Sequence, residues 1–306
     1  MSLAFSTSQL IWQTYAHSVD KLASDEKQNE ALRSFVNALY CSHGREETAS
    51  GEHVDRWFTS GAHPFFTMLK PLLMTLNAQA PLASLDLVVL AHWTHDTIIG
   101  HSVTNAVMHE VQANAAFGIA VSDHGISSSW LALSLIEDYL AEDDEEEARS
   151  SALLLIADQN TSLHESRYLD TISAQPCAGA VLLKKAPRGS QHGAKNEINF
   201  RGYTKIQPPV AWSTSWLATL SKQFFDAADG ELPLVIITSA FLASRFDERS
   251  SAKKINLHVW DDSLLSVAPW ALLKQCAEPA TRYFFLQEEN EAIMVAAFLS
   301  GSASCI

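Results

Sequence analysis

The chain has 306 residues, of which 47% are hydrophobic, and its formal net charge at pH 7 is −14. This length and apolar content suffice for a large buried core, in one domain or in two fused halves. The acidic balance argues against binding to nucleic acid or to anionic lipid, because both would be repelled.

The sequence carries no signal for secretion, membrane insertion or a disulfide framework. No apolar run reaches the roughly 18–20 residues of a membrane span, and the N-terminus lacks the basic start and cleavage site of a signal peptide. The four cysteines are scattered without a CxxC pair: Cys41, Cys177, Cys276 and Cys305. This usage is typical of a reducing compartment, and we expect a cytoplasmic protein without membrane contact.

Strand-like apolar runs alternate with helical patterns along the chain, which is typical of an α/β protein. The continuous runs LDLVVLA, ALLLIA and LPLVIIT predict strands that are buried on both faces of a sheet. In chain order, we expect helices at Glu26–Tyr40, Pro64–Leu76, Ser102–Asn114, Ser127–Tyr139, Trp212–Ala227 and Leu264–Cys276. We expect strands at Asp86–Ala91, Phe117–Val121, Ala152–Ala157, Gly179–Leu183, Leu234–Thr238, Tyr283–Gln287 and Ile293–Phe298.

Two charged segments are expected at the surface. The acidic run Glu142–Glu147 follows a predicted helix and is typical of a solvated loop. The segment Lys184–Arg201 is basic, contains glycine and has a length that suits a linker between two halves. A contact with phosphate or with a carrier protein is the alternative for this second segment, because it holds the only concentrated positive charge.

The most informative segment is FGIAVSDHGISSSWLAL, which begins at Phe117. A predicted strand stops at Ser-Asp-His-Gly and a helix of small residues follows. Such a bend presents one side chain to a pocket, above the free N–H groups of the helix N-terminus. The bend carries Asp123, which is a poor nucleophile for acyl transfer. The arrangement is typical of a catalytic site, but the residue is not.

Other segments extend this pattern along the chain. LDLVVLAHWTHD looks like a buried strand with a polar loop, and QPCAGAVLLKK keeps Ala178-Gly179-Ala180-Val181 of a glycine-rich GDGAGAVVL segment. LPLVIITSAF, HVWDDSLLSVAPWALL and FFLQEENEAIMVAAFL follow in the second half. From about Leu85 to Leu299, these segments together resemble the thiolase fold and specifically the β-ketoacyl-ACP synthase III family.

The resemblance implies a thiolase-like α/β fold of two similar βαβαβ-type halves in a layered α/β/α/β/α arrangement. It places the first half at residues 1–184, a linker at 185–194 and the second half at 195–306. Thiolase-fold proteins dimerise through a strand beside the nucleophile region, so the resemblance also implies a dimer.

Active members of this family use a Cys nucleophile that is assisted by a His and an Asn. The resemblance places the Cys position at Asp123 and the His position at Thr238 or Ser239. It places the Asn position at Asp262 or Asp261. The chemistry needs a thiolate at a helix N-terminus and donors for an oxyanion. On this alignment all three roles are lost together.

The family's two glycine-rich turns are also replaced, by Gln175-Pro176 and by Glu288-Glu289-Asn290. The resemblance therefore implies a non-catalytic, chain-length-factor-like subunit of a heterodimeric condensing enzyme of fatty-acid or polyketide-type secondary metabolism. Its partner would be a homologous subunit that contains the Cys. Acyl carrier protein or acyl-CoA would engage the complex through that partner. A structural homodimer that binds a small acid or aromatic compound stays open as a third reading.

A serine at the bend is the alternative nucleophile. Ser122 with His124 beside it would serve if the alignment were shifted by one residue, which would give a stand-alone acyltransferase. The run Ser127–Ser129 lies one residue short of the GxSxG pattern of α/β hydrolases, which would give a thioester hydrolase.

The densest group of metal-ligand side chains follows a predicted buried strand and comprises His92, His95, Asp96, His101, His109 and Glu110. Their spacing does not match HExxH or another diagnostic pattern, so we expect satisfied polar side chains without a metal. Phosphate-binding glycine loops are absent and no cofactor is expected. Four tryptophans near the same loops are expected to pack the core and to fill the acyl tunnel: Trp93, Trp130, Trp260 and Trp270.

Overall fold

The computed structural model describes residues 2–16, 26–42, 44, 63–98, 100–122, 124–141, 149–162, 169, 171–186, 196–246 and 256–301. Within them, eleven strands form one sheet of order β4-β3-β5-β6-β1-β7-β11-β10-β8-β9, and β2 pairs with β6 off this path. The strands are β1 Ser2–Ser6, β2 Leu10–Thr14, β3 Leu87–Ala91, β4 Phe117–Val121, β5 Ser151–Asp158, β6 Cys177–Ala186, β7 Glu197–Ile206, β8 Leu234–Thr238, β9 Asn256–Val259, β10 Arg282–Glu289 and β11 Ala292–Ser300.

The strand pairings of the first half recur in the second. In the first half β3 is parallel to β4 and β5, and β6 is antiparallel to both β5 and β1. In the second half β8 is parallel to β9 and β10, and β11 is antiparallel to both β10 and β7. The antiparallel pair of β1 with β7 joins the two sets. The prediction of two similar α/β halves is confirmed.

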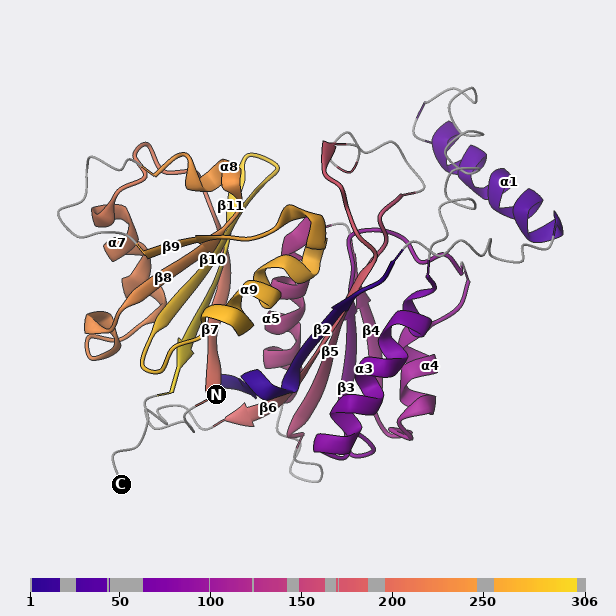
Figure 1. Ribbon diagram of the computed structural model, residues 1–306, viewed down its shortest axis with the longest axis horizontal. Coiled ribbons are helices and arrows are strands. Elements are labelled where there is room, and N and C mark those ends of the chain that lie inside the picture. The colour runs from indigo at the N-terminus through magenta and orange to yellow at the C-terminus, as the bar shows by residue number, and fades with distance from the viewer. Residues whose placement is uncertain are drawn as a thin grey trace.

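The helices lie in layers around this sheet (Figure 1). The two halves of the sheet face each other across α5 (Ser128–Ala141) and α9 (Ala268–Cys276), which are preceded by the 3-10 turns η3 (Gly125–Ser127) and η5 (Asp262–Val267). The outer faces are covered by α3 (Phe65–Gln79) and α4 (Val103–Glu110) on one side and by α7 (Thr214–Phe224) and α8 (Ala240–Ala243) on the other. Helix α1 (Glu26–Ser42) precedes them in the chain.

Three apolar clusters fill the spaces between these layers. The central cluster contains Trp130 of α5, Trp270 of α9 and Phe298 of β11. The other two lie under α3 and α4 and under α7. Each sheet half is therefore apolar on both faces, which explains why its parallel strands are continuous hydrophobic runs. None of the described helices is long and apolar enough to cross a membrane.

All predicted helices and strands are present, with shifted ends, but four strands were not predicted. β1, β2, β7 and β9 lie outside the continuous apolar runs. The prediction of a linker over the whole of Lys184–Arg201 is wrong at both ends, because β6 runs to Ala186 and β7 begins at Glu197. The acidic run Glu142–Glu147 and residues 187–195 lie outside the described residues.

A single buried carboxylate links the two halves. Asp158 ends β5 and is fully buried. Its Oδ1 accepts the backbone N–H groups of Trp93 and Thr94, each at 2.8 Å, and its Oδ2 accepts the N–H of Ser266 in η5 at 3.1 Å. Burial raises the pKa of Asp158, and hydrogen bonds from Ser266, Thr94 and Trp93 lower it in part. The loop after β3 and the turn before α9 are thus held by one side chain.

Replacing Asp158 with Asn should destabilise the fold strongly. The amide group would face the N–H of Ser266, so two donors would meet without an acceptor, at a cost of about 2–4 kcal/mol in the free energy of unfolding. Urea denaturation measures this loss. Asp226→Asn is the matched control, because Asp226 is exposed and accepts a single N–H, from Asp229. Equal losses in the two variants would contradict the role of Asp158.

Candidate functional site

The predicted strand, bend and helix are present in the structure. β4 ends at Val121, His124 is the N-cap of η3, and α5 begins at Ser128. Gly125, at the start of η3, has a φ of +50°. Residues other than glycine rarely adopt this backbone conformation. Asp123, the predicted nucleophile position, lies outside the described residues.

A pocket of about 280 Å³ opens at this bend. Its lining joins the loop after β3, the bend after β4 and the end of β10, and comprises Trp93, His124, Gly125, Ile126, Gln287, Glu289 and Asn290. The two halves of the chain therefore meet at the pocket, since the first four residues belong to one half and the last three to the other.

Glu289 is the central polar group of this pocket. Its Oε1 accepts the backbone N–H of Ser127 at 3.1 Å, and its Oε2 accepts the Ser127 hydroxyl at 2.8 Å. Burial raises the pKa of Glu289, while the hydrogen bonds from Ser127 and the charge of Lys205 lower it in part. Burial also raises the pKa of Tyr203, which neighbours both Ser127 and Glu289.

The sequence did not single out Glu289 as a pocket residue. In the sequence, Glu289 stands out only as part of the segment Glu288-Glu289-Asn290, which replaces a glycine-rich turn of the family. A 3-10 turn leaves its first N–H groups without partners in the turn, so the bend needs acceptors from elsewhere in the chain. The acidic residues that replace the glycine-rich turn could have been recognised as such acceptors.

Three of the four candidate serine nucleophiles lie in the interior. Ser127, Ser128 and Ser129 are all fully buried. The Ser127 hydroxyl donates to Glu289, and Ser129 Oγ accepts the indole N–H of Trp270 at 2.9 Å. Ser122 is partly buried, directly after β4. His124, its proposed assistant, is exposed and its carbonyl accepts the Ser127 N–H at 3.1 Å.

The two residues at the predicted His position form hydrogen bonds with nearby backbone groups. Thr238, the last residue of β8, is fully buried and its hydroxyl donates to the carbonyl of Leu286 at 2.8 Å. Ser239 caps α8, where its Oγ accepts the N–H of Leu242 at 3.3 Å. The Thr238 hydroxyl already donates its proton, so it is a poor donor toward a ligand.

The two residues at the predicted Asn position are also engaged locally. Asp261 caps η5, where its Oδ1 accepts the N–H of Ser263 at 3.0 Å. Asp262 accepts the indole N–H of Trp260 at 2.8 Å. The structure thus places Asp262 at the start of the turn before α9, where it holds a tryptophan.

Three of the four highlighted tryptophans belong to the central core. Trp130 is fully buried and packs edge-on against Trp260, with ring centroids 6.4 Å apart. Trp130 and Trp270 both contact Phe285, at centroid distances of 5.6 and 5.8 Å. The space between α5 and α9 is consequently filled by aromatic rings. Trp93 instead lines the pocket at the bend.

The histidine-rich segment is occupied by other contacts. His92 Nδ1 lies 2.7 Å from the carbonyl of Thr94, and Asp96 Oδ1 accepts the N–H of Phe65 at 2.9 Å. Glu110 forms an ion pair with Lys70 at 3.0 Å. Across the described ranges, no three His, Cys, Asp or Glu side chains gather in a way that could hold a metal ion. His101 and His109 are exposed.

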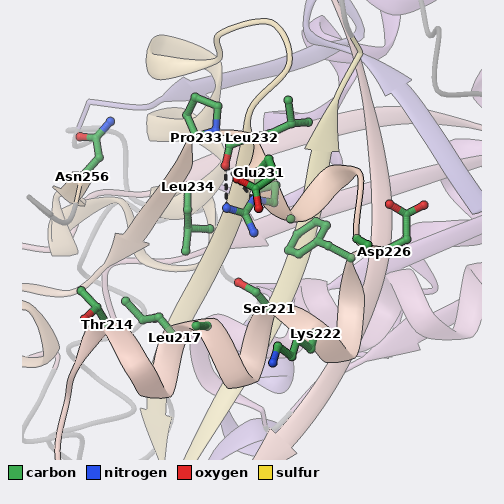
Figure 2. A pocket seen from close by; sticks show the side chains of 15 residues that line it. Thr214, Leu217, Ser221, Lys222, Asp226, Glu231, Leu232, Pro233, Leu234 and Asn256 are labelled. Atoms are coloured by element: carbon green, nitrogen blue, oxygen red, sulfur yellow. Dashed lines mark hydrogen bonds between the residues drawn. The ribbon is translucent and has the colours of Figure 1, made fainter.

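A larger cavity, of about 920 Å³, lies on the outer side of the second half between α7 and residues 226–233 (Figure 2). Arg282 lines it and donates to the Leu232 carbonyl at 3.0 Å from Nε and 2.6 Å from Nη2. Lys222 and Glu231 add opposite charges to the lining. This balance favours neither an anionic nor a cationic ligand.

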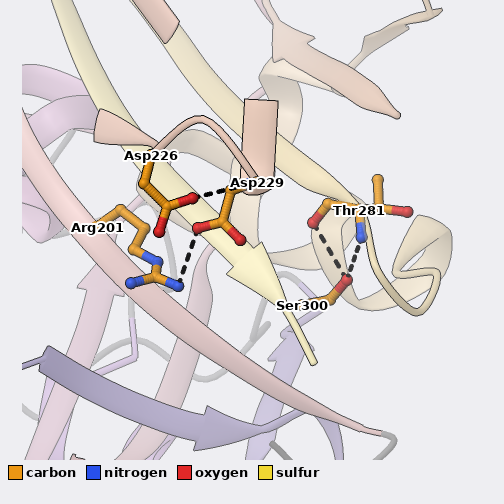
Figure 3. Close-up of polar contacts among 5 residues, drawn as sticks. All are labelled: Arg201, Asp226, Asp229, Thr281 and Ser300. Atoms are coloured by element: carbon orange, nitrogen blue, oxygen red, sulfur yellow. Dashed lines mark hydrogen bonds and ion pairs between the residues drawn. The ribbon is translucent and has the colours of Figure 1, made fainter. Parts of the chain in front are cut away.

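The segment beside this outer cavity is held by polar contacts (Figure 3). Arg201 of β7 forms an ion pair with Asp229 at 3.4 Å, and Asp226 accepts the Asp229 N–H at 2.9 Å. Close by, Ser300 Oγ accepts the N–H of Thr281 at 2.9 Å. The Arg201–Asp229 pair ties the connection between α7 and β8 to β7.

The topology, the central helices and the bend together define a thiolase-like fold. No protein-family model matches the sequence, and no curated protein matches it either. Solved structures do match in fold. The acyltransferase ChlB3 is 12% identical over 99% of both chains, with a TM-score of 0.59.

Two further structures show the same likeness. A 3-oxoacyl-(acyl carrier protein) synthase III from Pseudomonas aeruginosa is 13% identical over 98% of each chain, with a TM-score of 0.55. An OleA variant from Xanthomonas campestris is 11% identical over 98% of each chain, also with a TM-score of 0.55. At these identities the similarity establishes the fold and leaves the activity to the site itself.

Glu289→Gln should remove one source of the pH dependence of stability. Because burial raises the pKa of Glu289, the native state keeps a proton that the unfolded chain releases near its ordinary value of about 4.3. The free energy of unfolding therefore falls as the pH rises from that value through the raised native pKa. The Gln variant, which can keep both contacts with Ser127, should show a smaller fall.

Urea denaturation at a series of pH values between about 4 and 7 measures this difference. Glu231→Gln provides the control, because Glu231 is exposed. Identical pH profiles for wild type and Glu289→Gln would contradict the assignment.

Proposed function

We propose that this chain is a non-catalytic subunit of a heterodimeric condensing enzyme of fatty-acid or polyketide-type secondary metabolism. It would support a homologous partner that contains the Cys nucleophile, much as chain-length factors do. Acyl carrier protein or acyl-CoA would reach the complex through that partner, in the cytoplasm. The fold similarity to condensing enzymes supports this proposal, and so does one observation in the site.

In that observation, the side chains at the positions that would assist a nucleophile already form hydrogen bonds within the fold. Thr238 and Asp262 hold a strand carbonyl and an indole N–H, so neither is available to polarise a thioester. Asp123 adds a carboxylate where the family has a thiolate, and acyl transfer to it would give an unstable anhydride. A degenerate site of this kind suits a subunit that forms no acyl-enzyme of its own.

The filled interior agrees with this role. Trp130, Trp260 and Phe285 pack together between the central helices. A filled interior suits a supporting subunit, because such a subunit needs no tunnel for an acyl chain.

The exposed edge of β4 supports the partner assignment. β4 is the first strand of the sheet order, and its Phe117 and Ala120 are exposed. The N–H of Phe117 and the carbonyl of Val121 bond toward β3. In a parallel ladder the alternate residues Gly118 and Ala120 then direct their N–H and C=O groups outward. The strand carries no charge, proline or bulge that would block pairing, so it suits a second strand.

An apolar helix face adjoins this edge. Phe117 stacks on Tyr139 of α5, with ring centroids 6.2 Å apart. Leu135 lies one turn earlier on the same helix face and is exposed. Edge hydrogen bonds and apolar area are thus available together, as a stable dimer requires.

The proposal is tested by native mass spectrometry of the chain co-expressed with its genomic neighbours, followed by incubation with acyl-CoA thioesters. We expect a one-to-one complex in which only the partner gains acyl mass. The alternative is a stand-alone acyltransferase or thioester hydrolase that uses Ser122 or a serine of Ser127–Ser129. In that case this chain would gain the acyl mass alone and lose it with one Ser→Ala change.

Ala120→Pro should prevent assembly without unfolding the chain. The outward N–H of Ala120 serves no partner within the sheet, whereas a strand added at the edge would need it. Analytical ultracentrifugation should show the complex lost or weakened at least tenfold, about 1.4 kcal/mol. Val259→Pro on β9, at the opposite edge, is the matched control and should assemble as wild type does.

A further inference from the structure

The pocket at the bend contains a carboxylate that forms no ion pair with any described cation. The Glu289 carboxylate lines the pocket and forms no ion pair within the described part of the chain. Lys205 on β7 lowers its pKa by charge alone, and Arg245 is paired with Glu288 instead, at 3.5 Å.

A second acceptor in the same lining has no donor. Gln287 donates from Nε2 to the Glu288 carbonyl at 3.2 Å, whereas its Oε1 is buried and has no hydrogen-bond partner among the described residues. A buried acceptor without a donor is unfavourable, so a group that brings an N–H to it gains affinity.

The remaining walls suit a flat or compact cation. Trp93 lines the pocket together with the polar groups of β10, and an indole is the aromatic ring that attracts cations most strongly. Ile126 adds an apolar contact from η3. His124 is the other titratable side chain in the lining, and Tyr203 is the neighbouring phenol.

We propose that this pocket binds a cationic hydrogen-bond donor, namely a guanidinium or a primary ammonium group. The charge of Glu289, the free oxygen of Gln287 and the ring of Trp93 each favour such a group over a neutral one. The group could belong to a free small molecule or to an arginine or lysine of a bound protein chain. The inference does not depend on the non-catalytic role, because an isolated chain can bind the ligand.

The test compares two probes of similar shape and different charge, methylguanidinium and N-methylurea. Each is titrated into the purified full-length chain and followed by amide NMR at residues 124–127 and 287–290. Methylguanidinium should shift these resonances and bind at least about tenfold more tightly than N-methylurea. Equal affinity for the two probes, or shifts only outside the pocket, would overturn the proposal.

Variants separate charge from shape. Glu289→Gln should weaken methylguanidinium binding about tenfold and leave N-methylurea binding unchanged. Gln287→Leu should weaken it several-fold, because the ligand then loses one acceptor. Glu231→Gln in the outer cavity is the control and should have no effect. Undiminished binding by Glu289→Gln would overturn the proposal.

A final arm distinguishes the two sources of the cation. If a side chain of a partner fills the pocket, methylguanidinium should no longer shift these resonances in the purified complex. If the pocket serves a free amine or guanidine, binding should persist in the complex. Both results support a cationic site, and neither changes the acylation experiment, so failure of one proposal is separable from failure of the other.

Discussion

The hydrogen bonds of Asp158 are the interaction on which the rest of the structure depends. One carboxylate at the end of β5 fixes the loop after β3, which carries Trp93, and the turn before α9, which carries Ser266. The pocket at the bend lies between elements of the two halves, so its shape depends on this connection. Near the pocket the two halves are also joined by the hydrogen bonds from Ser127 to Glu289.

The same carboxylate also acts on a buried thiol beside it. Cys177 pairs with Asp158 across β5 and β6 and is fully buried. Burial and the charge of Asp158 raise the pKa of Cys177 well above its usual value. Its S–H donates to the carbonyl of Leu264 at 3.2 Å. This thiol therefore stays protonated and is a poor nucleophile.

Much of the fold was predictable from the sequence, because β3, β5 and β8 are buried on both faces and are continuously apolar. β7 was not, because Arg201, Gly202 and Lys205 give it the composition of a linker. Its pairing with β1 and β11 overrides that composition. The bend was predictable from its strand and helix, whereas Glu289 was not, because it lies 162 residues from its partner Ser127.

Turns with positive φ angles position the polar groups around the pocket. Asn290 and Glu291, between β10 and β11, have φ of +49° and +61°. For a residue such as Glu291, this left-handed backbone conformation costs about 1 kcal/mol. Leu265, beside Ser266, has a φ of +47° within a buried turn. Glycine would relieve the strain at all three positions. These turns hold Glu289 against Ser127 and Ser266 against Asp158, so the polar groups beside the pocket are positioned by the backbone.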